Sequence, residues 1–209
     1  MSRGSGPVTL MANAALLIVD VQNDFCPGGA LAVPNGDRVV AVLNRCLADA
    51  ARHGVRVYAS RDWHPAVSDH FIAFGGPWPP HCVQHTPGAE FHPDLHLPPA
   101  TVVITKGDDP HQHGYSAFDG HTDGGRSLLE DLRAHDIDEV VIGGLATDYC
   151  VRESVLDARR AGVRVTVLED AVAGIDVKNG DSERAFADMR AAGAHVTPST
   201  AWPSSSHTA

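Results

Sequence analysis

The stretch VVIGGLATDYCV, residues 140–151, decides the fold class of this chain. The apolar run at 140–142 has the composition of a buried strand, and the small residues after it predict a tight turn. A helix is expected to begin near Cys150, where unpaired N–H groups and the helix dipole would favour an anion. Such a setting lowers the pKa of a thiol and favours the nucleophilic thiolate. Most unpaired cysteines are inert core residues, so Cys150 is only a candidate nucleophile, and other segments must support this role.

Apolar runs alternate with helical patterns along the rest of the chain. Strands are predicted at 16–19, 55–59, 102–104, 140–142, 163–168 and 195–197, and helices at 37–52, at 127–135, from about 150 and at 181–193. This alternation is typical of a parallel sheet with helices on both faces. We therefore expect a three-layer α/β/α sandwich around a mainly parallel, six-stranded sheet. The single domain is predicted at 13–198, between a flexible lead-in at 1–12 and a flexible tail at 199–209.

The composition argues against several classes of protein. The 209 residues carry a formal net charge of −10, so the chain offers no basic footprint for nucleic acid. It lacks the run of about eighteen apolar residues that a membrane span needs, and its first residues show no secretory signal. Four scattered cysteines without a Cys-x-x-Cys pair favour a cytoplasmic protein with reduced thiols. A small-molecule partner fits these observations, and a homo-oligomer stays open.

Reactive side chains lie at or just past the ends of several predicted strands, and three of them form a first group. Asp20 follows the first strand, Lys106 the third and Cys150 the fourth, and ligands of parallel sheets bind beyond the carboxyl ends of the strands. A lone aspartate there is often only a helix cap or a turn residue, and a lone buried lysine is costly. An Asp–Lys pair beside the thiol would explain both residues. Asp20 could accept the thiol proton, and Lys106 could keep Asp20 charged and stabilise the thiolate.

A second group of candidate residues follows the second predicted strand. Asp62 and His64 are two residues apart and would share a face of an extended chain, and His70 and His81 come from the loop that follows. One carboxylate with three imidazoles suits Zn, Fe(II) or Mn. On spacing alone, the alternative is a set of surface-loop histidines that bind no metal.

The chain resembles the nicotinamidases (pyrazinamidases) of the isochorismatase-like cysteine hydrolase superfamily over roughly residues 14–197. The motifs are IVDVQNDF at 18–25, the Asp62…His64…His70 segment, WPPHCV at 78–83, TKG at 105–107 and ATDYCV at 146–151. The first and last motifs mark the superfamily. The Asp/His set together with the Trp-Pro-Pro-His-Cys sequence marks the nicotinamidase branch.

The resemblance implies a metal-containing cysteine amidase that hydrolyses nicotinamide, and also pyrazinamide, through a thioester intermediate. The implied catalytic triad is Asp20, Lys106 and Cys150, and the implied ligands of one divalent ion (Zn, Fe or Mn) are Asp62, His64, His70 and His81. A cis peptide at Leu145–Ala146 and an oxyanion hole made by the N–H groups of Ala146 and Cys150 are also implied. Phe25, Trp78 and Tyr115 match aromatic positions that line the pyridine pocket of the family, although plain core packing would also explain each of them.

One segment departs from the family pattern. Residues 108–113, DDPHQH, lie between Lys106 and Tyr115 and are expected near the mouth of the pocket, where they put the breadth of substrates in doubt. His111 and His113 could form an additional His-x-His metal site. A solvated loop is the better interpretation of these two histidines.

Four other functions stay as alternatives. An isochorismatase-type enzyme that cleaves a vinyl ether would not need Cys150, and an amidase for carbamoyl or ureido compounds would keep the triad without the metal ligands. A nucleotide-binding module would need a Gly-x-Gly-x-x-Gly turn after the first strand, which residues 20–24 lack. A metal or redox sensor would use paired cysteines. An assay for bound metal separates a nicotinamidase from a carbamoyl amidase.

Overall fold

Six strands form one sheet in the order β3-β2-β1-β4-β5-β6, and every neighbouring pair is parallel. The strands are β1 Ala14–Val19, β2 Arg56–Asp62, β3 Val102–Lys106, β4 Glu139–Leu145, β5 Arg164–Ala173 and β6 His195–Thr197. This computed structural model describes residues 13–202 of the chain. The predicted six-stranded, mainly parallel sheet is confirmed.

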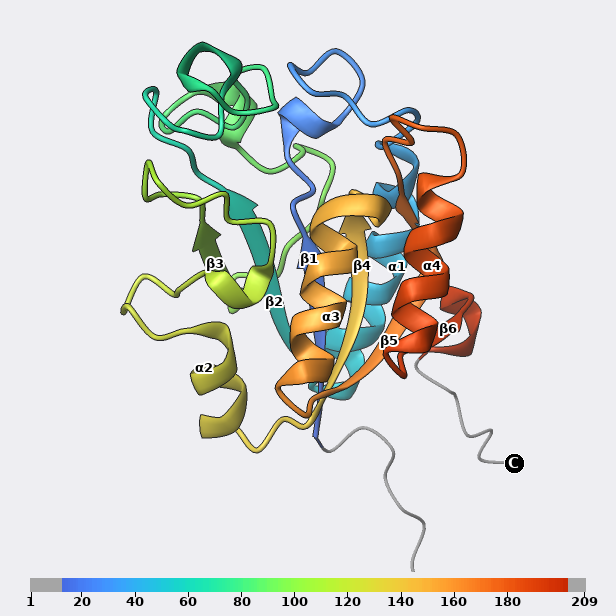
Figure 1. Ribbon diagram of the computed structural model, residues 1–209. Coiled ribbons are helices and arrows are strands. Elements are labelled where there is room, and N and C mark those ends of the chain that lie inside the picture. The colour runs from blue at the N-terminus through green and yellow to red at the C-terminus, as the bar shows by residue number, and fades with distance from the viewer. Residues whose placement is uncertain (1–12, 203–209) are drawn as a thin grey trace, which may run out of the picture.

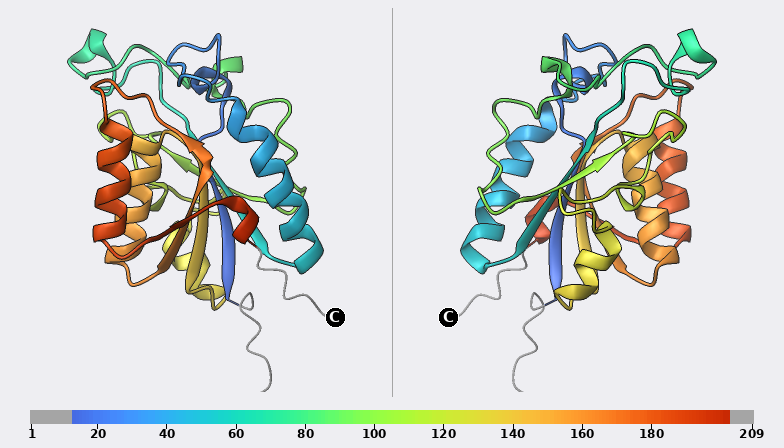
Figure 2. Two further views of the ribbon diagram at one scale, coloured as in Figure 1. Left: turned by 90° about the vertical axis from the view of Figure 1, so that its right-hand side faces the viewer. Right: turned by 90° about the vertical axis from the view of Figure 1, so that its left-hand side faces the viewer.

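Helices cover both faces of the sheet, as Figure 2 shows. They are α1 Arg38–His53, α2 Leu128–Ala134, α3 Arg152–Arg160 and α4 Asp181–Ala191. Helix α1 lies on one face, and α2, α3 and α4 lie on the other. The three-layer α/β/α sandwich expected from the sequence is therefore the observed architecture.

The central strand β1 explains why its sequence is a continuous apolar run. Leu16 and Ile18 pack into the core under α1, whereas Leu17 and Val19 pack into the core under the other three helices. Side chains alternate between the faces of a strand, so a strand covered on both faces needs apolar residues throughout. Its pairing agrees with this burial, because β1 lies between β2 and β4 in the interior of the sheet.

Strand β5 is longer than the predicted strand at 163–168. Glu169 and Asp170 are exposed in the middle of β5, and the strand returns to a buried position at Ala171. The pairing of β4 with β5 changes register between Ile142 and Gly144. The polar pair ends the apolar run at residue 168, so the apolar pattern predicted only the first half of this strand.

The packed part of the chain continues past residue 198. Ser199 donates hydrogen bonds from its N–H and its hydroxyl to the carboxylate of Asp170, both at 2.6 Å, and Trp202 is buried. The predicted lead-in at 1–12 and the part of the predicted tail at 203–209 lie outside the described residues. Within residues 13–202, no helix is long and apolar enough to cross a membrane.

The order of the strands places the site. The chain passes from β1 outward to β3, returns to pair β4 with β1, and then proceeds outward to β6. Ligands in such sheets bind at the carboxyl ends of the strands where this reversal occurs. Long loops gather over this edge, at the top of Figure 1.

Candidate active site

Asp20, Lys106 and Cys150 meet at the carboxyl edge of the sheet. Asp20 follows β1 with φ 48°, Lys106 is the last residue of β3, and Cys150 lies in the helical turn Thr147–Val151 that leads into α3. Lys106 Nζ is 2.7 Å from Asp20 Oδ2 and 3.6 Å from Cys150 Sγ. All three residues are buried. The structure therefore brings together the three residues proposed from the ends of the strands.

The protonation of this group differs from the expectation drawn from the helix end. Burial raises the pKa of the Cys150 thiol well above its usual range; Lys106 opposes this rise, and the Asp20 and Asp62 carboxylates add to it. The expected lowering of the thiol pKa is therefore wrong, because desolvation and two carboxylates outweigh the helix end and Lys106. Burial also raises the pKa of Asp20, with Lys106 acting against it. Burial therefore favours the neutral thiol of Cys150, while the charge of Lys106 favours the ionised form of Asp20.

Two buried side chains that the sequence analysis did not single out position the carboxylates. The Ser60 hydroxyl donates to Asp20 Oδ1 at 2.7 Å. The amide of Gln22 donates to the carbonyl of Asp62 and accepts from its N–H, both at 2.8 Å. Gln22 lies inside the IVDVQNDF motif, so the motif contained a signal, but the partner of its amide is 40 residues away.

The four predicted metal ligands also come together. One ring nitrogen from each of His64, His70 and His81 lies within 4.8 Å of the others. Asp62 Oδ2 is 3.7 Å from His64 Nε2 and 4.0 Å from His81 Nε2. The other oxygen of Asp62 forms an ion pair with Lys106. Asp62 thus connects the cluster of three imidazoles to Lys106, which in turn contacts Cys150.

The chemistry of this donor set fits a divalent metal ion. His64 Nδ1 lies 3.0 Å from the Gly107 carbonyl and His81 Nδ1 lies 2.8 Å from the Pro79 carbonyl, so the Nε2 atom of each ring is left to act as a ligand. His64 Nε2 is buried without a hydrogen-bond partner. Burial, together with the neighbouring imidazoles, lowers the pKa of His70 to about 3. Neutral imidazoles and an ionised carboxylate are the forms that bind Zn, Fe or Mn.

Aromatic residues line a pocket between the thiol and the imidazole cluster. Trp78 Nε1 donates to the hydroxyl of Tyr115 at 2.8 Å, and the Trp78 and Tyr149 rings meet edge to face at 4.9 Å. The pocket is lined by Phe25, Leu31, Asp62, His70, Trp78, His81, Tyr115, Ala146, Tyr149, Cys150 and Ile175. The three aromatic residues expected from the family resemblance are therefore all at this pocket.

The turn that carries Cys150, residues 145–151 (the nucleophile turn), contributes two further features to the pocket. The Leu145–Ala146 peptide is cis, as the resemblance implies, and both Ala146 and Cys150 line the pocket. The Asp148 carboxylate accepts a hydrogen bond from the N–H of Ile175 at 3.0 Å. Ile175 lies in the loop after β5, and this hydrogen bond holds it at the pocket. Asp148 and Ile175 were not singled out by the sequence analysis, because their contact joins segments 27 residues apart.

The match to known proteins places the chain in a family. The model of the isochorismatase domain matches residues 14–201. The chain belongs to the isochorismatase family. The resemblance inferred from the sequence motifs is thereby confirmed.

Relatives in this isochorismatase family include two bacterial enzymes. The nicotinamidase of Escherichia coli K12 is 43% identical over 208 residues, which cover 92% of this chain and 98% of the relative. The nicotinamidase/pyrazinamidase of Mycobacterium tuberculosis is 41% identical over 189 residues, covering 89% and 99%. A crystal structure of the pyrazinamidase of Pyrococcus horikoshii in complex with zinc superimposes with a TM-score of 0.82 at 44% identity, covering 89% and 99%.

The loop that departs from the pattern of this isochorismatase family separates its two histidines. His111 is exposed and its Nδ1 lies 2.8 Å from Asp69 Oδ2, whereas His113 Nδ1 lies 3.2 Å from His70 Nδ1. The two rings therefore have different partners and do not share one His-x-His site. His113 contacts the imidazole cluster, a role that the sequence analysis did not predict.

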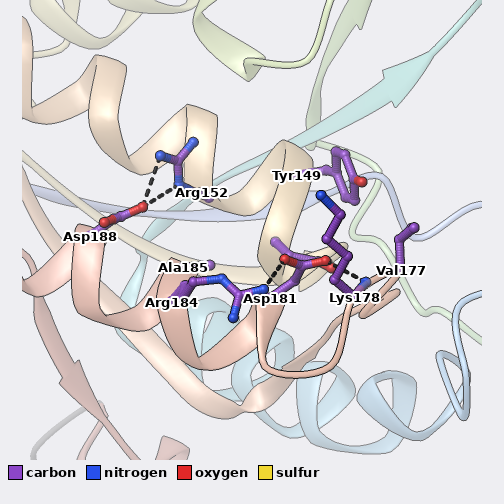
Figure 3. A pocket seen from close by; sticks show the side chains of 9 residues that line it. Tyr149, Arg152, Val177, Lys178, Asp181, Arg184, Ala185 and Asp188 are labelled. Carbon is purple, nitrogen blue, oxygen red and sulfur yellow. Dashed lines mark hydrogen bonds and ion pairs between the residues drawn. The ribbon is translucent and has the colours of Figure 1, made fainter. Parts of the chain in front are cut away.

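A second hollow lies on the outer side of the nucleophile turn (Figure 3). Arg152 pairs with Asp188 at 2.9 Å, and Arg184 pairs with Asp181. Tyr149 lines both this hollow and the inner pocket. Neither a thiol nor an imidazole lines the outer hollow. The candidate nucleophile and the imidazoles that could hold a metal are at the inner pocket.

Proposed function

We propose that this chain is a nicotinamidase, a cysteine amidase that hydrolyses nicotinamide, and also pyrazinamide, to the carboxylate and ammonia. The observation that carries the proposal is one pocket lined by Cys150, by aromatic side chains and by two members, His70 and His81, of the cluster of three imidazoles. The names of the bacterial relatives support the same substrate. The four unpaired cysteine thiols support a cytoplasmic location.

The mechanism begins with the thiol proton. Asp20 takes the proton from Cys150 Sγ, and the thiolate attacks the carboxamide carbon to form a C–S bond. The N–H groups of Ala146 and Cys150 stabilise the resulting oxyanion. Asp20 then gives the proton to the amide nitrogen, the C–N bond breaks, and ammonia leaves a thioester on Cys150.

Hydrolysis of the thioester returns the enzyme to its first state. Asp20, now ionised, accepts a proton from a water molecule that attacks the thioester carbon. The C–S bond breaks, Asp20 returns its proton to the thiol, and nicotinic acid leaves and gives its carboxyl proton to the solvent as nicotinate. Throughout the cycle the Lys106 ammonium, 2.7 Å from Asp20, stabilises the negative charge that moves between Asp20 and Cys150.

One divalent ion, Zn, Fe or Mn, would be held beside the catalytic triad by Asp62, His64, His70 and His81. The ion would supply a Lewis acid at the wall of the pocket. Aromatic side chains would orient the substrate. Phe25, Trp78 and Tyr115 would pack against the pyridine ring and direct the carboxamide toward Cys150.

Ammonia release from nicotinamide tests the proposal. We expect the wild-type protein to release ammonia, a chelator to abolish release, and added metal to restore it. Cys150→Ala is expected to release no ammonia while it keeps its fold and its metal content, measured by circular dichroism and elemental analysis. Full activity of Cys150→Ala would overturn the mechanism. No release by a folded, metal-loaded wild type would reject nicotinamide and favour the carbamoyl amidase.

A further inference from the structure

The three imidazoles of the cluster differ in what positions their Nδ1 atoms. A main-chain carbonyl lies at hydrogen-bond distance from Nδ1 of His64, at 3.0 Å, and of His81, at 2.8 Å. The Nδ1 atom of His70 instead lies 3.2 Å from Nδ1 of His113. Two of the rings are therefore oriented by the main chain, and the third by a side chain from the loop at 108–113.

The hydrogen-bond partners determine where the protons lie. A carbonyl oxygen can only accept, so Nδ1 of His64 and of His81 each carries a hydrogen, and each Nε2 has a free lone pair. For His70 to offer its Nε2 lone pair in the same way, its Nδ1–H must donate to the Nδ1 atom of His113. His113 then carries its own hydrogen on Nε2.

We propose that His113 is a positioning residue that fixes the tautomer and the ring orientation of His70 for metal binding. The proposal rests on the metal site of the proposed function. Groups that accept the N–H of a ligating histidine typically contribute a factor of about 10–100 to metal affinity. At His70 this contribution depends on one replaceable side chain.

Other contacts hold His113 where this role requires it. Its ring stacks on Tyr115 with centroids 5.9 Å apart and an interplanar angle of 27°. The next residue, Gly114, has φ +61°, and a Cβ there would lie 2.5 Å from the Gly107 nitrogen. The loop therefore closes on Gly107, whose carbonyl contacts His64. One short loop thus supplies a hydrogen-bond acceptor at each end, for His64 at Gly107 and for His70 at His113.

Zinc affinity of the full chain tests the proposal without any assay of hydrolysis. Zinc alone is titrated in competition with a chromophoric chelator, for the wild type and three variants. We expect His113→Ala to weaken zinc binding about 10–100-fold. His113→Asn should retain most of the affinity, because Asn Oδ1 can accept where Nδ1 does. His111→Ala should leave it unchanged, because His111 is exposed and bonds to Asp69.

The outcomes separate this inference from the proposed function. Wild-type zinc affinity in a folded His113→Ala, or an equal loss in His111→Ala, overturns the role of His113. The inference also fails if the wild type binds no zinc. The proposed function fails on a different measurement, the release of no ammonia from nicotinamide by metal-loaded wild type. Because His113 is exposed, its truncation is expected to leave the fold intact, which circular dichroism checks.

Discussion

Gly107 is the residue whose replacement should damage the imidazole cluster most directly. It has φ +68°, and a Cβ there would lie 2.5 Å from Cε1 and 2.8 Å from Nδ1 of His64. Gly107→Ala must therefore displace His64 from the Gly107 carbonyl. We expect zinc affinity to fall by a factor of 10 or more, roughly the loss of one supporting hydrogen bond to a ligand. Chelator competition measures this affinity.

Gly125→Ala is the matched control for this prediction. Gly125 has φ +75°, but a Cβ there would have no heavy atom within 4 Å. Both variants therefore carry the strain of a left-handed backbone, about 1–2 kcal/mol, and only Gly107→Ala also carries the contact with His64. An equal loss of zinc affinity in the two variants would contradict the explanation.

At the scale of residues, the sequence predicted groups that lie at strand ends and missed groups that act through distant partners. Asp20, Lys106 and Cys150 each follow an apolar run, so parallel strands were sufficient to place them at one edge of the sheet. Ser60 and His113 contact residues 40 and 43 positions away, and no local pattern indicates such contacts. The direction of the Cys150 pKa was wrong because it depends on burial and on two carboxylates, which only the packed fold reveals.

One carboxylate on helix α2 forms hydrogen bonds to side chains of strand β2. Asp131 on α2 accepts hydrogen bonds from the Tyr58 hydroxyl at 2.8 Å, Arg126 at 3.1 Å and Arg56 at 3.3 Å. Burial raises the pKa of Asp131, but the hydrogen bond from Tyr58 and the charge of Arg56 outweigh it, so the net pKa is lowered. The ionised form of Asp131 therefore stabilises the fold.

Asp131→Asn should lose this stabilisation in a pH-dependent way. A carboxyl whose folded pKa lies below its unfolded value of about 3.9 stabilises the fold fully above that value, and the contribution disappears as the pH falls through the folded pKa. We expect the variant to be about 1–3 kcal/mol less stable at pH 7, with a smaller difference at acid pH. Urea unfolding at both pH values measures this change.

Asp138→Asn provides the comparison for Asp131→Asn. Asp138 pairs with Arg164 at 2.9 Å, but both side chains are 58% exposed, and such surface pairs contribute less than about 1 kcal/mol. A loss at pH 7 as large as that of Asp131→Asn would assign the effect to the removal of charge. A difference that grows toward acid pH would contradict the sign of the Asp131 pKa shift.

Among the elements, the sequence predicted long regular segments and missed short irregular ones. The apolar run of β1 and the spacing of α1 were sufficient to locate both. The start of α2 is marked by a capping box, in which Ser127 and Glu130 each accept the other's backbone N–H, and the predicted helix at 127–135 agrees with α2 to one residue at each end. The second half of β5 was missed because its inner residues do not form a continuous apolar run.

At the scale of the whole molecule, the alternation of strands and helices predicted the layers but not the order of the strands. The same alternation is compatible with several parallel sheets, because each right-handed crossover can extend the sheet on either side. In this chain β1 and β4 are neighbours at the centre. That pairing brings Asp20, which follows β1, and Cys150, which follows β4, to one crevice.

Loops from three strands converge on the imidazole cluster, so a metal should stabilise the molecule as a whole. Asp62 ends β2 and is hydrogen-bonded to Gln22 after β1, and His64 contacts Gly107 after β3. A ligand at 100 times its Kd adds about 2.7 kcal/mol if only the folded state binds it. For a chain of this size that raises Tm by roughly 5–11 °C, which calorimetry of metal-free and zinc-loaded protein measures. Cys150→Ala should show the same rise, and His64→Ala should show much less. An unchanged Tm of the wild type at saturating zinc would mean that these loops do not share a metal.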